Sequence, residues 1–175
     1  MNLDFIKDRI VAVPDFPKPG IVFRDITPLL ADPQGLKMTA KAMAEELKSK
    51  GIKPTIIAGT ESRGFIFGVA LAEALGLGFV PVRKPGKLPR ETYKVSYQLE
   101  YGSDSLEIHK DAFKPTDKVL VVDDLLATGG TAKATVQLIE KTQASVEGLI
   151  FVIELEDLNG RKTLEGYNVS ALVKY

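Results

Sequence analysis

The sequence predicts an α/β protein with a mostly parallel central sheet and helices on both faces. Two observations predict this: short apolar runs rich in β-branched residues, and helical stretches that alternate with them along the chain. A chain of 175 residues suits one domain, and folding of such a chain buries roughly 70% of its unfolded surface. We therefore expect residues 1–175 to form a single domain.

The buried strands are expected at four short apolar runs bounded by turn residues. These are Thr55–Gly59, Phe79–Val82, Lys118–Val122 and Leu149–Ile153. Helices are expected between them at Pro33–Lys50, Arg63–Leu75 and Gly130–Thr142. Gly51 and Gly76 follow the first two helices, where glycine commonly ends a helix in a left-handed conformation. Because a strand–helix–strand unit crosses over to a parallel neighbour, this order predicts a parallel sheet.

Residues 84–110 interrupt the alternation. Within the run from Thr92 to Gly102, Thr92–Tyr97 alternates as a strand does. A turn is expected at Ser103–Asp104, before Leu106–His109. This segment is either an antiparallel excursion at the sheet edge or a flexible lid over a binding site.

Composition excludes several classes of function. The 23 Lys and Arg residues balance the 23 Asp and Glu residues, which argues against sequence-independent nucleic-acid binding. With no Cys and one His, disulfides, zinc–thiolate sites, thiol catalysis and sites with two imidazoles are excluded. No run approaches the ~20 apolar residues of a membrane-spanning helix, and the first ten residues do not resemble a signal peptide. We expect a cytoplasmic protein without nucleic-acid or membrane partners.

The segment Val119–Thr131, VLVVDDLLATGGT, carries the most specific chemistry. Its apolar run places Asp123 and Asp124 at the carboxyl end of a strand, where open α/β sheets bind ligands. The small residues that follow open a helix and can cradle a phosphate with backbone N–H groups: Ala127, Thr128, Gly129, Gly130 and Thr131. A side chain at Gly129 would then block the phosphate and leave the fold intact. Since carboxylates accept hydrogen bonds from ribose hydroxyls, the segment predicts a sugar-phosphate site. The structural alternative is that Asp123 caps a turn and Asp124 points to solvent.

A second anion site is indicated after the first strand. Glu61, Ser62 and Arg63 open a helix, so their amides and the Arg63 guanidinium could bind an anion. Alternatively, Ser62 caps the helix and Arg63 is solvated. Arg83, Lys84 and Lys87 form a basic loop that is either solvated surface or a counter-charge for a diphosphate.

Two further candidates are weaker. Phe23 and Arg24 precede strand-like Asp25–Ile26 in an expected loop, and an aromatic ring beside exposed backbone suits a planar base. Alternatively, Phe23 fills the core. Glu100, between Tyr97 and Tyr101, reads on sequence alone as an exposed strand carboxylate.

VLVVDDLLATGGT is similar to the 5-phosphoribosyl-1-pyrophosphate (PRPP) signature of type I phosphoribosyltransferases, and Ala127 resembles the form found in adenine-specific members. Four further segments resemble the family in the same order: PGIVFRDITPLL from Pro19, ESRGFIFG from Glu61, RKPGKLP from Arg83 and YQLEYG from Tyr97. The resemblance spans nearly the whole chain.

The resemblance implies the fold of that family, with a hood from residues 1–30 and a lid from residues 84–110. It implies purine salvage, in which adenine and PRPP give AMP and pyrophosphate, with Mg²⁺ held mainly by PRPP and no direct metal ligand, in a homodimer. The implied roles are Val22, Phe23 and Arg24 for adenine; Asp123, Asp124 and Ala127 to Thr131 for ribose and phosphate; Glu61, Ser62, Arg63, Arg83, Lys84 and Lys87 for pyrophosphate; Glu100 and Arg63 for catalysis; and Tyr97 and Tyr101 for the lid. A 6-oxopurine or pyrimidine phosphoribosyltransferase is an alternative, as is a PRPP-sensing regulator, although no added domain or basic excess is present for the latter.

Overall fold

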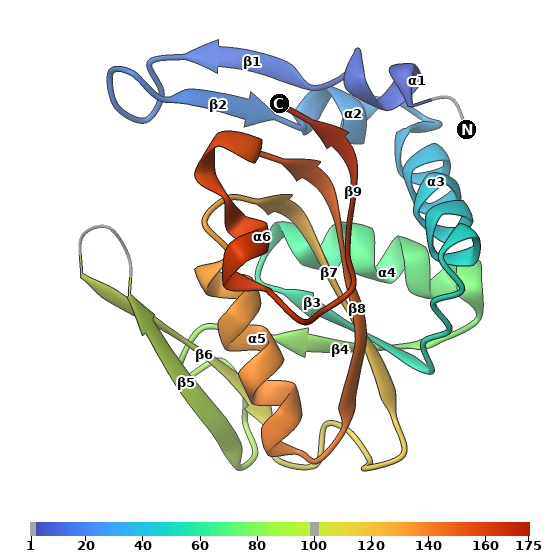
Figure 1. Ribbon diagram of the computed structural model, residues 1–175, viewed down its shortest axis with the longest axis vertical. Coiled ribbons are helices and arrows are strands. Elements are labelled where there is room, and N and C mark those ends of the chain that lie inside the picture. Colours follow the sequence, from blue (N-terminus) through green and yellow to red (C-terminus); the bar gives the residue numbers. More distant parts are fainter. Residues whose placement is uncertain (1–2, 99–101) are drawn as a thin grey trace.

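A five-stranded parallel sheet forms the centre of the computed structural model, which describes residues 3–98 and 102–175 (Figure 1). Its order is β4 (Gly78–Val82), β3 (Ile56–Thr60), β7 (Lys118–Leu126), β8 (Ser145–Glu154) and β9 (Val169–Lys174). The predicted parallel sheet is confirmed. Strand β9 was not expected.

Strands β7 and β8 are longer than predicted. The pairing of β7 with β8 continues through Asp123 opposite Phe151 to Leu126 opposite Glu154. Because this ladder extends past the apolar run, Asp123 and Asp124 lie within the last residues of β7 and not beyond its end.

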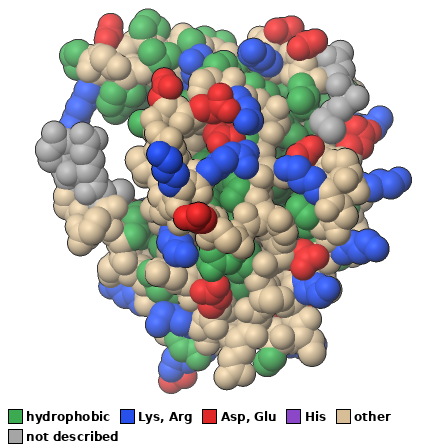
Figure 2. Space-filling model, viewed as in Figure 1, with side chains coloured by type: hydrophobic (Ala, Val, Ile, Leu, Met, Phe, Trp, Pro, Cys, Tyr) green, Lys and Arg blue, Asp and Glu red, His purple; other side chains and the backbone are tan. Residues whose placement is uncertain are grey.

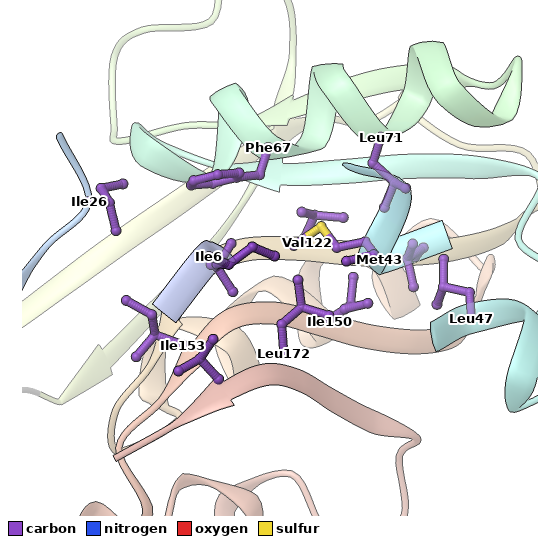
Figure 3. Packing of buried hydrophobic residues seen from close by; sticks show 14 of the residues in the cluster. Ile6, Ile26, Met43, Leu47, Phe67, Leu71, Val122, Ile150, Ile153 and Leu172 are labelled. Carbon is purple, nitrogen blue, oxygen red and sulfur yellow. The ribbon is translucent and has the colours of Figure 1, made fainter. Parts of the chain in front are cut away.

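Helices cover both faces of the sheet, as predicted. One face packs against α3 (Gly35–Ser49) and α4 (Arg63–Leu75), and the other against α5 (Gly130–Lys141). Along β7 the fully buried Leu120 and Val122 face the first pair of helices, whereas Val119 and Val121 face α5, as the alternation of a strand requires. Figure 3 shows the first of these clusters, in which Phe67 and Met43 from the helices meet Val122 and Ile150 from the sheet.

Glycine allows α4 to approach β3 closely. A Cβ at Gly59 would lie 2.5 Å from the Phe79 ring, and one at Gly68 would lie 2.6 Å from it. The ring therefore fills the space that two side chains would otherwise occupy. The helix ends at Gly76, which has a φ of 66° and continues the chain in the left-handed conformation.

The excursion is a separate antiparallel pair, β5 (Thr92–Gln98) and β6 (Ser103–His109). Asp104 pairs with Tyr97 and Ser103 with Gln98, so the turn expected at Ser103–Asp104 is wrong. Both residues belong to the ladder, because the pairing continues to the end of β5. The base of the hairpin is anchored, since Leu106 and Ile108 are fully buried against the α5 side of the core.

The N-terminal residues form α1 (Asp4–Lys7), the hairpin β1 (Val11–Pro14) and β2 (Val22–Asp25), and α2 (Thr27–Ala31). Figure 1 shows this hairpin crossing above the end of β9. Phe23 and Arg24 lie in β2, paired with Val13 and Ala12, so the expected loop at these residues is wrong.

Between β8 and β9 the chain forms the short helices η1 (Glu156–Leu158) and α6 (Gly160–Thr163). Within the described residues, no helix is long and apolar enough to cross a membrane. On the face shown in Figure 2, Lys and Arg side chains are interspersed with Asp and Glu.

Candidate active site

A cavity of about 470 Å³ lies at the carboxyl ends of β3 and β7. The chain adds β4 on one side of β3 and then β7, β8 and β9 on the other, so the strand order reverses between these two neighbouring strands. Open α/β sheets bind ligands at such a point. The cavity has the size of a small-molecule site. The lining residues are Glu61, Ser62, Arg63, Lys84, Tyr97, Phe151 and the continuous run from Asp123 to Ala132.

The loop Ala127–Gly130 joins β7 to α5 and forms one wall of the cavity. Gly129 precedes the first residue of α5 with a φ of 86°, a conformation that L-residues with side chains rarely adopt. A Cβ there would lie 2.7 Å from the Gly160 carbonyl oxygen and 2.9 Å from the Thr163 Cβ. The expectation that a side chain at Gly129 leaves the fold intact is therefore wrong.

The two acids of β7 have different surroundings. The Asp124 carboxylate forms an ion pair with Arg63, whose Nε lies 2.7 Å away, and only 8% of the Asp124 side chain is exposed. It therefore does not point to solvent, as the structural alternative required. Asp123 Oδ1 accepts the Asp124 N–H at 2.9 Å. Burial, followed by the nearby Asp124 charge, raises the pKa of Asp123 well above its usual 3.8.

The residues between β3 and α4 form the opposite wall. Ser62 makes no side-chain hydrogen bond that caps α4, and the Glu61–Ser62 peptide bond is cis. Glu61 Oε2 accepts from the Lys84 N–H at 2.9 Å and the Arg83 Nε at 3.2 Å, which lowers the pKa of Glu61. Glu61 thereby holds the basic loop beside the start of α4.

Glycine also sets the distance between the two walls. A Cβ at Gly64, in the first turn of α4, would lie 2.8 Å from Asp123 Oδ1 and 2.9 Å from the Val122 carbonyl oxygen. Any side chain at this position would push α4 away from β7.

The hairpin contributes polar groups to the cavity. The Tyr97 hydroxyl accepts from Thr131 Oγ1 at 3.3 Å and donates to Asp104 Oδ2 at 3.3 Å. Asp104 also pairs with the Lys84 ammonium. This contact lowers the pKa of Asp104 and, against the effect of partial burial, raises the pKa of Lys84. Lys87 is exposed and is not among the lining residues.

The three residues expected at adenine do not line the cavity. Phe23 adjoins it, because the Arg63 guanidinium lies 5.6 Å from the centre of its ring. Arg24 turns toward the end of β9, where its guanidinium lies 3.7 Å over the Tyr175 ring. Glu100 and Tyr101 lie outside the described residues.

Sequence reasoning missed two contributions. Asp104, which the sequence placed in a turn, faces Lys84. The helix α6, from a segment without a recognisable motif, packs behind the loop Ala127–Gly130. No pattern in the sequence pointed to α6, because its contacts with the loop use a glycine and a single hydroxyl. Among the described residues, no group of three or more His, Asp or Glu side chains is arranged to hold a metal ion.

Comparison with known proteins gives consistent results. Residues 25–169 match the model of the phosphoribosyl transferase domain. The chain is 97% identical to the adenine phosphoribosyltransferase of Francisella philomiragia over the full length of both. The crystal structure of the Thermoanaerobacter pseudethanolicus enzyme of that name superposes with a TM-score of 0.95 at 52% identity, covering 99% of this chain and 100% of that one. The Saccharomyces cerevisiae enzyme, solved with an imino-altritol bisphosphate and adenine, gives a TM-score of 0.93 at 42% identity and 97% coverage of both chains.

Proposed function

The chain belongs to the phosphoribosyltransferase family, and we propose how the residues of its cavity share the work of the reaction. The enzyme transfers the 5-phosphoribosyl group of PRPP to adenine, giving AMP and pyrophosphate. The observation that carries the proposal is that a single cavity joins a phosphate-loop wall to a second wall at the start of α4. Two walls suited to anions match a substrate with phosphates at both ends.

The loop Ala127–Thr131 binds the 5-phosphate of PRPP. Its amides precede and begin α5, so hydrogen-bond donors and the helix dipole act on the same anion. The Asp123 and Asp124 carboxylates lie beside this loop and accept hydrogen bonds from the ribose hydroxyls. Both acids line the cavity, which supports this assignment.

The wall formed by Glu61, Ser62 and Arg63 binds the pyrophosphate group, together with Lys84. Arg63 and Lys84 supply positive charge where negative charge develops as the C1–O bond breaks. Arg83 and Glu61 hold the basic loop in place through their contact at 3.2 Å. Lys87 is exposed and does not line the cavity, so its positive charge acts on the pyrophosphate from a greater distance.

Adenine lies next to Phe23, on the side of the ribose opposite the departing pyrophosphate. Val22 and Arg24 contribute through the backbone of β2, because the Arg24 side chain packs on Tyr175. From the family resemblance, Glu100 is the general acid/base at the imidazole ring of the purine, and residues 84–110 with Tyr97 and Tyr101 act as the lid over the site. Alignment and electrostatic stabilisation supply most of the rate enhancement.

Mg²⁺, when bound with PRPP, would supply positive charge beside the leaving pyrophosphate. The donor set fits this role, since Mg²⁺ commonly binds to one or two carboxylates and substrate phosphates, and Asp123 and Asp124 both line the cavity. Asp124 is already paired with Arg63, which favours an ion held chiefly by substrate oxygens. The family resemblance also supports a cytoplasmic homodimer with one hood, residues 1–30, on each subunit.

The test is pyrophosphate release from PRPP and Mg²⁺ with a panel of bases. Adenine should support turnover, and hypoxanthine, guanine and orotate should not. A chelator should abolish turnover, and Mg²⁺ should restore it. Equal rates with hypoxanthine would contradict the proposed adenine specificity, and full activity in chelator would contradict the role of Mg²⁺.

A further inference from the structure

The short helix α6 lies directly behind the phosphate loop. Thr163 Oγ1 donates to the Thr128 carbonyl at 2.7 Å, across 35 residues of sequence. A Cβ at Gly160 would lie 2.3 Å from the Ala127 carbonyl oxygen. Two successive carbonyl groups of the loop therefore point toward α6.

The direction of these carbonyls fixes the direction of the amides. In a planar trans peptide, the C=O of one residue and the N–H of the next point in opposite directions. The N–H groups of Thr128 and Gly129 therefore point away from α6, toward the cavity that both residues line. Within the described part of the chain, neither N–H has a hydrogen-bond acceptor.

A partly buried ion pair attaches α6 to the sheet. Arg161 binds both carboxylate oxygens of Glu154, at 2.6 and 2.7 Å, and donates to the Val169 carbonyl at 2.8 Å. Glu154 ends β8, and only 5% of its side chain is exposed. Such a two-point contact holds α6 in a defined position between β8 and β9.

We infer that Thr163 is a positioning residue for the 5-phosphate site: its hydroxyl holds the Thr128 carbonyl so that the Gly129 N–H is aimed at the phosphate. Thr163 does not line the cavity, so it acts through the loop and not on the ligand. This inference rests on the proposed assignment of the loop to the 5-phosphate. It also predicts that Thr163 affects one end of PRPP only, because the pyrophosphate wall is built from different elements.

The experiment measures binding of ribose 5-phosphate and of pyrophosphate by calorimetry. Thr163→Val keeps the shape of the side chain and removes its donor, and Thr163→Ser is the matched control that keeps the hydroxyl. Thr163→Val should weaken ribose 5-phosphate about tenfold, as expected for one lost hydrogen bond, and should change pyrophosphate affinity by less than about twofold. In turnover, KM for PRPP should rise, whereas kcat and KM for adenine stay close to wild type. Thr163→Ser should restore ribose 5-phosphate binding.

Unchanged ribose 5-phosphate affinity in Thr163→Val would overturn the inference. Equal weakening of both ligands would also overturn it, since that result indicates a general structural role. Failure of the wild-type enzyme to bind ribose 5-phosphate, or binding unaffected by changes in the loop itself such as Thr131→Val, would instead contradict the proposed function of the loop.

Discussion

The Arg63 Nε lies 2.7 Å from the Asp124 carboxylate, so an ion pair joins the two walls of the cavity. Arg63 is 45% exposed, whereas only 8% of the Asp124 side chain is exposed. A diphosphate can therefore reach the Arg63 guanidinium from the cavity, but the nearly buried Asp124 carboxylate then needs new hydrogen-bond donors in place of Arg63. The release of Asp124 would leave its carboxylate available to the ribose hydroxyls.

Arg63→Ala should lower kcat by about two to three orders of magnitude. The loss of one charge-assisted contact to a developing charge costs roughly 2–4 kcal/mol of barrier. Arg63→Lys, which keeps the charge without the planar fork, should recover part of the rate. The measurement is steady-state kinetics with KM for adenine as the internal reference. An alanine variant within about twofold of wild type would show that Arg63 is only a surface residue.

Asp104→Asn should strengthen pyrophosphate binding severalfold. The Asp104 carboxylate pairs with Lys84 and competes with an incoming diphosphate for its ammonium group. The matched control is Asp111→Asn, which removes a carboxylate that pairs with Arg90 outside the cavity. Titration with pyrophosphate at low ionic strength measures the effect. Weaker binding in Asp104→Asn would show that Asp104 positions Lys84 and does not compete for it.

Gly129→Ala should destabilise the protein more than Gly166→Ala. Both glycines have a strongly positive φ, 86° and 91°, but a Cβ at Gly166 meets nothing within 4 Å. The shared backbone cost is about 1–2 kcal/mol, and contact with the Gly160 carbonyl should add about 1–3 kcal/mol in Gly129→Ala alone. Thermal or denaturant unfolding of the two variants measures the difference. Equal losses would mean that α6 moves aside without cost.

Asp123→Asn should raise the melting temperature near neutral pH, by roughly 2–4 °C for each kcal/mol gained. The folded-state pKa of Asp123 lies above the unfolded value of 3.8, so the folded protein binds more protons between the two values. Its stability therefore falls as pH rises through this window, and asparagine removes that loss. Below about pH 3.8 the advantage should vanish. The control is the exposed Asp157→Asn; a benefit independent of pH would contradict the raised pKa.

Glu100→Gln should reduce turnover by about 100-fold with substrate affinities little changed, since it removes a general acid/base and keeps the size of the side chain. This prediction comes from the family resemblance of YQLEYG alone. Pre-steady-state kinetics with adenine and PRPP, followed over a range of pH, measure the chemical step. Near-normal rates of that step would mean that catalysis needs no carboxylate at residue 100.

The central architecture could be predicted from sequence because its signals are local. The helix Arg63–Leu75 was predicted to the residue, since Gly76 ends it and apolar periodicity defines it. The ends of strands were harder to predict. Strand β7 continues through Asp123 because β8 pairs with this part of the chain, and the sequence of β7 alone does not reveal that pairing. Strand β9 was missed because Val169–Lys174 follows a segment without recognisable motifs.

The candidate site shows the same division. Its two walls follow from the residues after β3 and β7, because parallel strands deliver their carboxyl ends to one edge. The contacts that orient these walls depend on tertiary packing. Asp104 reaches Lys84 through the register of the hairpin, and Arg24 turns to Tyr175 because alternation along β2 places it on the face opposite Phe23.

Gly64 has a consequence for the length of ligand that the cavity accepts. Because this residue has no side chain, the first turn of α4 rests directly on the β7 backbone, and this contact limits how closely the two proposed anion sites can approach each other. Such a contact cannot be shortened, and it lengthens only if α4 moves as a body. The enzyme therefore selects ligands by the separation of their charged groups, and a sugar with phosphate at one end only can occupy one of the two proposed sites.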